Sequence, residues 1–173
     1  HKTGTDRIFE VLQKLDYKNI DLVMNLQGDE PLMNIEDIRK LNDQMIKSQS
    51  QLGTLASKIK DKALYENENI VKVHTKEHLD DLNFPEAINF MRKSLNQSKN
   101  IYHHLGIYCY QKETLKKFVA YDQSSNEIKN NLEQMRALDN KININVALAK
   151  SSPIGVDTEE DFVAIKKIME YKS

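Results

Sequence analysis

An acidic loop directly follows a predicted buried strand near the start of the chain. The apolar residues 20–26 stop abruptly at Gln27, and the sequence then reads Gly-Asp-Glu-Pro. In open α/β sheets, ligands bind beyond the carboxyl ends of the strands, so Asp29 occupies a position suited to a hard cation and its polyphosphate. A simple turn would also use this glycine and proline, but an amide and two acids are more than a turn requires. We therefore predict a functional site at Asp29.

A second acidic residue, Asp157, follows another predicted strand end. It comes after a Pro-Ile-Gly break and precedes the last predicted helix. The local pattern favours N-capping by Asp157 or Thr158, because both residue types are preferred caps. The alternative is metal ligation, since Mg²⁺ commonly takes one or two protein carboxylates together with waters and substrate phosphate oxygens. Asp29 and Asp157 are thus the candidate catalytic and metal-ligating residues.

Glu133 and Gln134 lie on a predicted helix whose apolar stripe is Leu132, Met135 and Leu138. The two polar side chains either form part of a solvated face or point into a pocket and hydrogen-bond a polyhydroxylated substrate. Both readings remain open on the local pattern alone.

Other kinds of chemistry are weakly indicated. His74 and His78 have a spacing that suits zinc, but a third ligand is lacking. Cys109 lies inside an apolar stretch, where a thiol is typically inert. The sequence has no nucleophile elbow, no Walker A loop and no dinucleotide fingerprint. The predicted chemistry therefore depends on the acidic loop and its partners.

The elements that must position these residues alternate between helices and strands. Apolar residues at helical spacing predict one helix capped by Thr5 or Asp6 and a second that begins at Asn34. Ser124 and Glu127 form a capping-box pattern that predicts another helix. We expect an α/β fold of the Rossmann-like type, with a mixed, mostly parallel sheet flanked by helices. The predicted strands are residues 20–26, 52–58, 70–73, 87–91, 105–110 and 142–148, and the later helices include residues 112–121, 128–138 and 162–169.

Composition argues against two classes of function. The 25 basic and 26 acidic residues give a net charge of -1, which lacks the positive field of sequence-independent nucleic-acid binding. No apolar run approaches the roughly 18 to 20 residues of a membrane span. The length suits one well-buried domain over residues 1–173. Cys109 is the only cysteine, so no intrachain disulfide can form, and we expect a reducing compartment, the cytoplasm.

Five short motifs follow one another in order over nearly the whole chain. They are Thr3-Gly4-Thr5-Asp6-Arg7, Leu26-Gln27-Gly28-Asp29-Glu30-Pro31, His104-Leu105-Gly106-Ile107-Tyr108, Leu132-Glu133-Gln134-Met135-Arg136 and Gly155-Val156-Asp157-Thr158. Together they resemble the 3-deoxy-manno-octulosonate cytidylyltransferases, also called CMP-KDO synthetases. Five motifs in this order are much more specific than any one of them.

The resemblance implies a nucleotidyltransferase fold, a homodimer, and transfer of a cytidylyl group from CTP to 3-deoxy-manno-octulosonate (KDO). The products would be CMP-KDO, which is used in lipopolysaccharide biosynthesis, and pyrophosphate. By the same resemblance, Asp29 and Asp157 would hold Mg²⁺. The nucleotide would contact Gly4, Thr5, Arg7 and Gln27, and the sugar acid would contact Arg92, His104, Glu133 and Gln134.

Two departures from the family pattern affect these expectations. The family's N-terminal strand and its triphosphate-gripping loop would precede His1, so we expect an N-terminally truncated domain with little or no transferase activity by itself. His103 stands where the family usually has arginine, and the segment around Arg92 also differs. The alternatives are therefore a cytidylyltransferase for another 2-keto sugar acid, such as an 8-amino KDO analogue or sialic acid, and an inactive binding domain.

Overall fold

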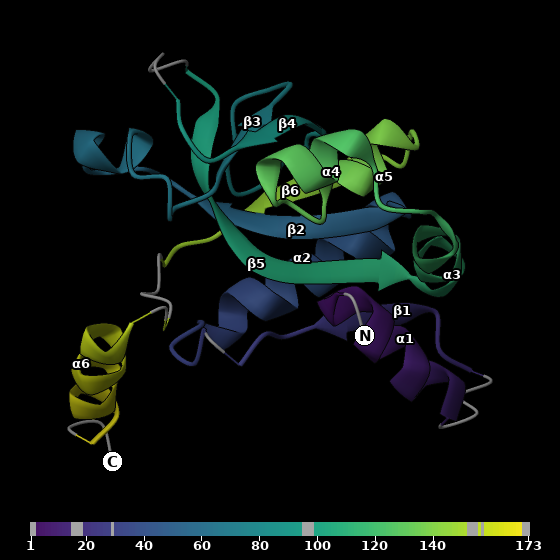
Figure 1. The fold of residues 1–173 in the computed structure, drawn as a ribbon, viewed down its shortest axis with the longest axis horizontal. Helices are drawn as coiled ribbons and strands as arrows, with labels where there is room; N and C mark the ends of the chain where they lie inside the picture. Colours follow the sequence, from purple (N-terminus) through teal and green to yellow (C-terminus); the bar gives the residue numbers. More distant parts are fainter. Residues whose placement is uncertain are drawn as a thin grey trace.

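The computed structural model describes residues 3–14, 19–28, 30–94, 99–151, 156 and 158–170. Helices and strands alternate along these residues (Figure 1), and the predicted α/β class is confirmed. The α-helices are α1 (Gly4–Lys14), α2 (Ile35–Ser48), α3 (Lys112–Ala120), α4 (Ser125–Asn130), α5 (Met135–Asp139) and α6 (Glu159–Glu170), and Lys62–Tyr65 forms a short 3-10 helix. The strands are β1 (Leu22–Asn25), β2 (Leu52–Ser57), β3 (Lys72–Thr75), β4 (Ala87–Met91), β5 (Ile101–Gln111) and β6 (Ile144–Leu148).

These strands form one sheet with β5 near its centre. The order is β4-β3-β5-β2-β6, and β1 also pairs with β5. Among the described pairings only β2 and β6 run parallel, so the prediction of a mostly parallel sheet is wrong. The physical reason is connectivity, because a parallel pair needs a crossover of a dozen or more residues, usually through a helix. β3 and β4 instead pair across residues 76–86, which form no helix.

The long strand β5 has β1 and β3 along one edge, at different positions. β1 pairs with residues 108–111 of β5, whereas β3 pairs with residues 101–103. On the opposite edge, the register with β2 shifts beside Thr54, so that Gly106 and Ile107 of β5 have no partner in β2. Residues 104–107 therefore lie between β1 and β3, next to the carboxyl end of β1. This is the position at which an open α/β sheet receives a ligand.

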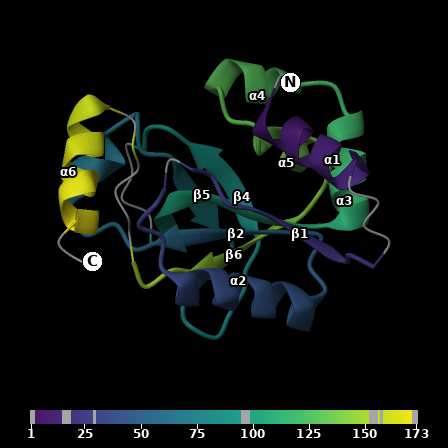
Figure 2. The same cartoon turned by 90° about the horizontal axis from the view of Figure 1, so that it is seen from below.

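Helices cover both faces of the sheet, as Figure 2 shows. On one face, Leu41 and Met45 of α2 are buried in a core with apolar side chains of β2 and β5. On the other face, a second core includes Leu12 of α1, Phe118 of α3, Met135 of α5 and Leu132, which lies between α4 and α5. Burial of these apolar side chains is the main force that holds the layers together. Helix α6 lies apart from the other helices in both views.

Two helix starts are fixed by reciprocal hydrogen bonds. The predicted capping box is confirmed, because Glu127 N donates to Ser124 Oγ at 3.1 Å and Ser124 N donates to the Glu127 carboxylate at 3.1 Å. For α1, Asp6 N donates to Thr3 Oγ1 at 3.3 Å, and Thr3 N donates to Asp6 Oδ2 at 3.2 Å. Thr3 therefore takes the capping role that we assigned to Thr5 or Asp6.

The single helix expected over residues 128–138 is divided into α4 and α5. Asn131 ends α4 with φ of 50°, in the left-handed region where Asn is tolerated. Residues 131–134 join the two helices, and they carry Glu133 and Gln134. The break removes these two side chains from a regular helix face.

Candidate functional site

A pocket of about 590 Å³ lies at the carboxyl end of β1. Its volume falls within the range of small-molecule sites, roughly 300 to 1,000 Å³. Three chain segments that are distant in sequence form its wall, namely α1, residues 25–28 and the segment between α4 and α5. The lining residues are Gly4, Arg7, Ile8, Val11, Asn25, Leu26, Gln27, Gly28 and Glu133. The structure thus brings three of the four predicted nucleotide-binding residues together with one predicted sugar-binding residue.

Helix α1 presents one face of its first turns to this pocket. Gly4, Arg7 and Val11 recur at intervals of three and four residues, which places them on the same side of a helix. Thr5 is buried, and its hydroxyl lies 3.4 Å from the hydroxyl of Tyr110. The Arg7 cation and the positive end of the helix dipole act on the same pocket. This part of the wall favours an anionic ligand.

Gly106 of β5 contacts the acidic loop. Its backbone N–H donates a hydrogen bond to Glu30 Oε1 at 3.0 Å. A Cβ atom at Gly106 would lie 3.4 Å from that oxygen and 3.6 Å from Gln27 Nε2. The hydrogen bond therefore ties Glu30 to the stretch of β5 between β1 and β3. Gln27 remains exposed and lines the pocket.

Glu133 contributes a partly desolvated carboxyl group to the pocket. Burial raises its pKa, while hydrogen bonds with Thr5 and Thr3 and the charge of Arg136 act in the opposite direction. Its Oε1 atom is buried and has no hydrogen-bond partner among the described residues. A carboxyl oxygen in this state is suited to a hydroxyl or amine of a bound ligand.

Strand β5 places a row of rings beside Glu133. The rings of His104 and Tyr108 lie 5.4 Å apart, and those of Tyr108 and Tyr110 lie 6.1 Å apart. Burial is the main cause that raises the pKa of Tyr108 well above its ordinary value, and the neighbouring charges of Glu133 and Glu30 add to it. We did not identify Tyr108 as a site residue from the sequence. Its place two residues after Gly106 on β5 is the signal that would have found it, because alternate strand residues share a face.

His104 is buried and neutral. Its Nε2 atom lies 3.0 Å from the hydroxyl of Thr54, and its ring meets Phe90 edge-on at 5.0 Å. Burial lowers the pKa of His104 to about 3, with a smaller contribution from His103. The imidazole therefore carries no charge in neutral solution.

Three of the four predicted sugar-binding residues, His104, Arg92 and Gln134, are not among those lining the pocket. The Arg92 guanidinium donates to the backbone carbonyls of Asn130, Asn131 and Glu68, at 3.1, 2.9 and 3.2 Å. Gln134 is buried beside Glu133 in the chain. In this structure Arg92 thus fastens the end of α4 to the end of β4.

The two predicted metal ligands, Asp29 and Asp157, lie outside the described residues. Their chain neighbours Gly28 and Val156 both line a second pocket, of about 640 Å³, and Gly28 also lines the first pocket. Among the described residues, no group of three or more His, Cys, Asp or Glu side chains could hold a metal ion. Carboxylate oxygens of the kind that Asp29 and Asp157 carry suit Mg²⁺.

None of the described helices has the length and apolar character needed to cross a membrane.

Comparisons with known proteins bear on the same residues. The cytidylyltransferase family model matches residues 1–144. The 3-deoxy-manno-octulosonate cytidylyltransferase of Afipia carboxidovorans is 38% identical over 171 residues, which cover 98% of this chain and 68% of the relative. The enzyme of the same name from Thermodesulfovibrio yellowstonii is 38% identical over 179 residues, covering 98% of this chain and 70% of the relative.

Solved structures extend the comparison to the fold. A structure of CMP:2-keto-3-deoxy-manno-octonic acid synthetase complexed with CTP matches with a TM-score of 0.86 at 28% identity, and the match covers 100% of this chain and 70% of that one. Apo UDP-glucose pyrophosphorylase matches with a TM-score of 0.70 at 11% identity, covering 99% of this chain and 61% of that one, which shows a shared fold alone.

Proposed function

Because the chain belongs to the 3-deoxy-manno-octulosonate cytidylyltransferase family, we propose that it transfers the cytidylyl group of CTP to KDO. The products are CMP-KDO, for lipopolysaccharide synthesis, and pyrophosphate. The observation that carries this proposal is the pocket in which Gly4, Arg7 and Gln27 meet Glu133. It combines groups suited to a nucleotide with a carboxyl group suited to a hydroxylated acceptor.

The nucleotide is bound by the wall made of α1 and residues 25–28. Arg7 and the start of α1 favour the negative charge of a phosphate chain. The exposed amide of Gln27 carries both hydrogen-bond donors and acceptors, which a pyrimidine ring or a ribose requires. Gly4 leaves room for close approach, because nothing lies within 4 Å of the position that its Cβ would take. Thr5 supports this wall from behind through its contact with Tyr110.

The sugar acid is bound on the side of Glu133 and Gln134. Glu133 Oε1 accepts a hydroxyl of the acceptor, and the buried ring of Tyr108, which contacts His104, lies near Glu133. Arg92 suits the acceptor carboxylate chemically, because a guanidinium can grip a carboxylate through two parallel hydrogen bonds. To do so it must release backbone carbonyls that it holds in the described structure.

We assign Mg²⁺ to Asp29 and Asp157. The meeting of the two pockets at Gly28, next to Asp29, and the position of Val156 at the second pocket support this assignment. When bound, Mg²⁺ would neutralise charge on the triphosphate and so favour departure of pyrophosphate.

The chain's own residues contribute by positioning the two substrates. The anomeric hydroxyl of KDO attacks the α-phosphorus of CTP, forming a new P–O bond, while the bond to the β-phosphate breaks and the hydroxyl proton is released. Holding the two reactants in line supplies most of the acceleration in such transfers, together with electrostatic stabilisation. No covalent enzyme intermediate is required.

The test is pyrophosphate release from CTP with KDO, measured on the protein that carries this chain. We expect turnover that requires both substrates and is abolished by EDTA and restored by Mg²⁺. Sialic acid and the 8-amino KDO analogue serve as matched acceptors. Faster turnover of either would change the proposed acceptor, and binding of CTP without turnover of any acceptor would reject a transferase in favour of a binding protein.

Two further properties, the cellular compartment and the oligomeric state, complete the proposal. We place the enzyme in the cytoplasm, consistent with its single buried thiol, whose pKa burial raises to about 12. We further propose that it acts as a homodimer, which sedimentation of the purified protein can test.

A further inference from the structure

A buried ion pair joins the two helices on either side of Glu133. Arg136 Nε donates to Glu127 Oε2 at 2.8 Å, and Arg136 Nη2 donates to Glu127 Oε1 at 2.5 Å. The two side chains are only 3% and 4% exposed. Glu127 belongs to α4 and Arg136 to α5. The ion pair therefore links α4 to α5 across the short segment 131–134.

Both side chains make further contacts within the fold. The Glu127 carboxylate also accepts from Ser124 N at 3.1 Å and from Gln123 Nε2 at 3.1 Å. The Arg136 guanidinium lies over the Phe118 ring, 4.7 Å from its centre, a cation–π arrangement. These contacts hold both side chains in place, so neither is available to bind substrate directly.

The same two residues also hold the backbone of the segment. Leu132 N donates to the Glu127 carbonyl at 3.2 Å, and Arg136 N donates to the Glu133 carbonyl at 3.1 Å. Arg92 fixes the start of the segment through the Asn130 and Asn131 carbonyls. These contacts hold the segment that carries Glu133 to the pocket. Among the described residues, Glu127–Arg136 is the only buried ion pair.

The ion pair also sets the electrostatic environment of the Glu133 carboxyl group. Arg136 and Glu127 both act on the Glu133 carboxyl, with opposite sign, and Asp6 acts on Arg136. The other groups that face Glu133 are Thr3 at the cap of α1, Thr5 within α1, Tyr108 and Tyr110 of β5, and Arg7 across the pocket. Without Glu127, the described carboxylates that still act on Arg136 are Glu133 and Asp6, and we expect Arg136 to draw Glu133 away from the ligand.

We propose that Glu127 and Arg136 are positioning residues for substrate binding, which hold Glu133 toward the pocket and keep the Arg136 cation occupied. The proposal rests on the proposed function only in assigning substrate contact to Glu133.

The test uses Glu127→Gln and Arg136→Gln in the active protein. Glutamine also serves in a capping box, so Glu127→Gln retains the start of α4. We expect each variant to raise KM for the sugar acid about tenfold, with kcat changed less than about threefold, because a small displacement of a positioned group weakens binding strongly. The matched control is Met45→Ala, which creates a cavity in the core under α2, on the other face of the sheet.

Two further readouts separate positioning from a general loss of stability. The low-pH limb of the KM profile moves to lower pH in Glu127→Gln, because removal of that negative charge lowers the pKa of Glu133, and to higher pH in Arg136→Gln. Amide hydrogen exchange of residues 131–134 becomes faster in both variants but not in Met45→Ala. KM values within twofold of wild type, equal KM changes in Met45→Ala, or pH limbs that move in the same direction would overturn the proposal. If the wild type shows no turnover of CTP and KDO, the proposed function fails, and the exchange measurement still decides whether the pair holds the segment.

Discussion

Gln27 is the pocket residue whose contribution is easiest to isolate, because its side chain is exposed and lines the site. We predict that Gln27→Ala raises the Kd for CTP about tenfold, the equivalent of one lost hydrogen bond at about 1.4 kcal/mol. The free energy of unfolding should change by less than about 0.5 kcal/mol, as expected for an exposed position. Titration calorimetry and urea unfolding measure the two quantities.

Gln13→Ala is the matched control, because Gln13 is an exposed glutamine of α1 that is not among the lining residues. Equal CTP affinities in the two variants would remove Gln27 from the site.

The buried histidine predicts how stability depends on pH. The pKa of His104 is lowered from its ordinary value of 6.5 to about 3 by burial. Between these pH values the unfolded chain binds more protons than the folded one, so the stability due to neutral His104 is complete above pH 6.5 and declines as the pH falls toward 3. At pH 5 the loss is about 2 kcal/mol, since each pH unit corresponds to about 1.4 kcal/mol. We expect His104→Gln to be less stable at pH 7.5 but to lose about 2 kcal/mol less than wild type on transfer to pH 5.

Urea midpoints at pH 7.5 and pH 5 provide this measurement. His78→Gln, which changes an exposed histidine, should retain the wild-type difference between the two pH values. A wild-type difference retained in His104→Gln as well would contradict the assignment of a neutral, buried imidazole.

Site residues could be predicted where a short sequence motif identifies them. They could not be predicted where the side chain is engaged in a contact with a distant part of the chain. Gly4, Arg7, Gln27 and Glu133 were named from motifs and meet in one pocket. The bonds of Arg92 to the carbonyls of α4 could not be foreseen, because they depend on how the end of β4 packs against a distant helix.

At the scale of elements, α2 is attached to the end of β6 by one buried carboxylate. Asp37 is fully buried, and it accepts from Lys150 N at 2.9 Å, from Ser151 N at 3.2 Å and from Ser151 Oγ at 2.8 Å. We predict that Asp37→Ala lowers the free energy of unfolding by about 2 to 4 kcal/mol, because buried backbone donors are left unsatisfied. Urea unfolding at neutral pH measures this loss.

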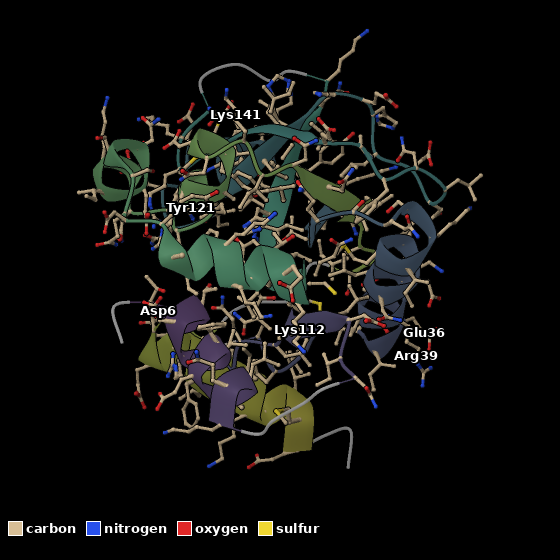
Figure 3. All side chains as sticks on the ribbon, turned by 90° about the vertical axis from the view of Figure 1, so that its right-hand side faces the viewer. Asp6, Glu36, Arg39, Lys112, Tyr121 and Lys141 are labelled. Carbon is tan, nitrogen blue, oxygen red and sulfur yellow. The ribbon has the colours of Figure 1, made fainter. Side chains whose placement is uncertain are left out.

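The adjacent residue provides the control for this change. Glu36 pairs with Arg39 on the outer face of α2 (Figure 3), and both side chains are well exposed. Glu36→Ala should therefore change stability by no more than about 1 kcal/mol. Similar losses in Asp37→Ala and Glu36→Ala would show that the buried carboxylate has no special role.

The outcomes for individual elements follow the same division between local and distant interactions. The capping box of Ser124 and Glu127 is confirmed, since its geometry involves only four consecutive residues. The break at Asn131 was missed, because the apolar stripe continues across it and only the packing of α4 and α5 with Arg92 and Arg136 favours two helices. The shift in register between β2 and β5 was also missed. It accommodates Gly106 beneath the acidic loop, a contact that no local pattern encodes.

For the whole molecule, ligand binding should increase stability by mass action. CTP that binds the folded chain at a concentration of 100 times its Kd raises the free energy of unfolding by about 2.7 kcal/mol. For a chain of this size that corresponds to an increase in Tm of about 5 to 10 °C. Thermal unfolding monitored by circular dichroism, with CTP and Mg²⁺, checks the value. The same concentration of ATP serves as the control, and an equal increase with ATP would contradict a site that selects cytidine nucleotides.

The family, the α/β class and most helices and strands could be predicted from the amino-acid sequence. Those features depend on motifs, on apolar periodicity and on caps, which act over a few residues. Three features became visible only in the folded chain. They are the mostly antiparallel pairing of the sheet, the division of the expected helix at Asn131, and the grouping of α1, residues 25–28 and Glu133 around one pocket. Strand pairing and pocket geometry arise from contacts between residues far apart in the chain, whose free energy depends on how whole layers pack. A local pattern contains no information about that packing.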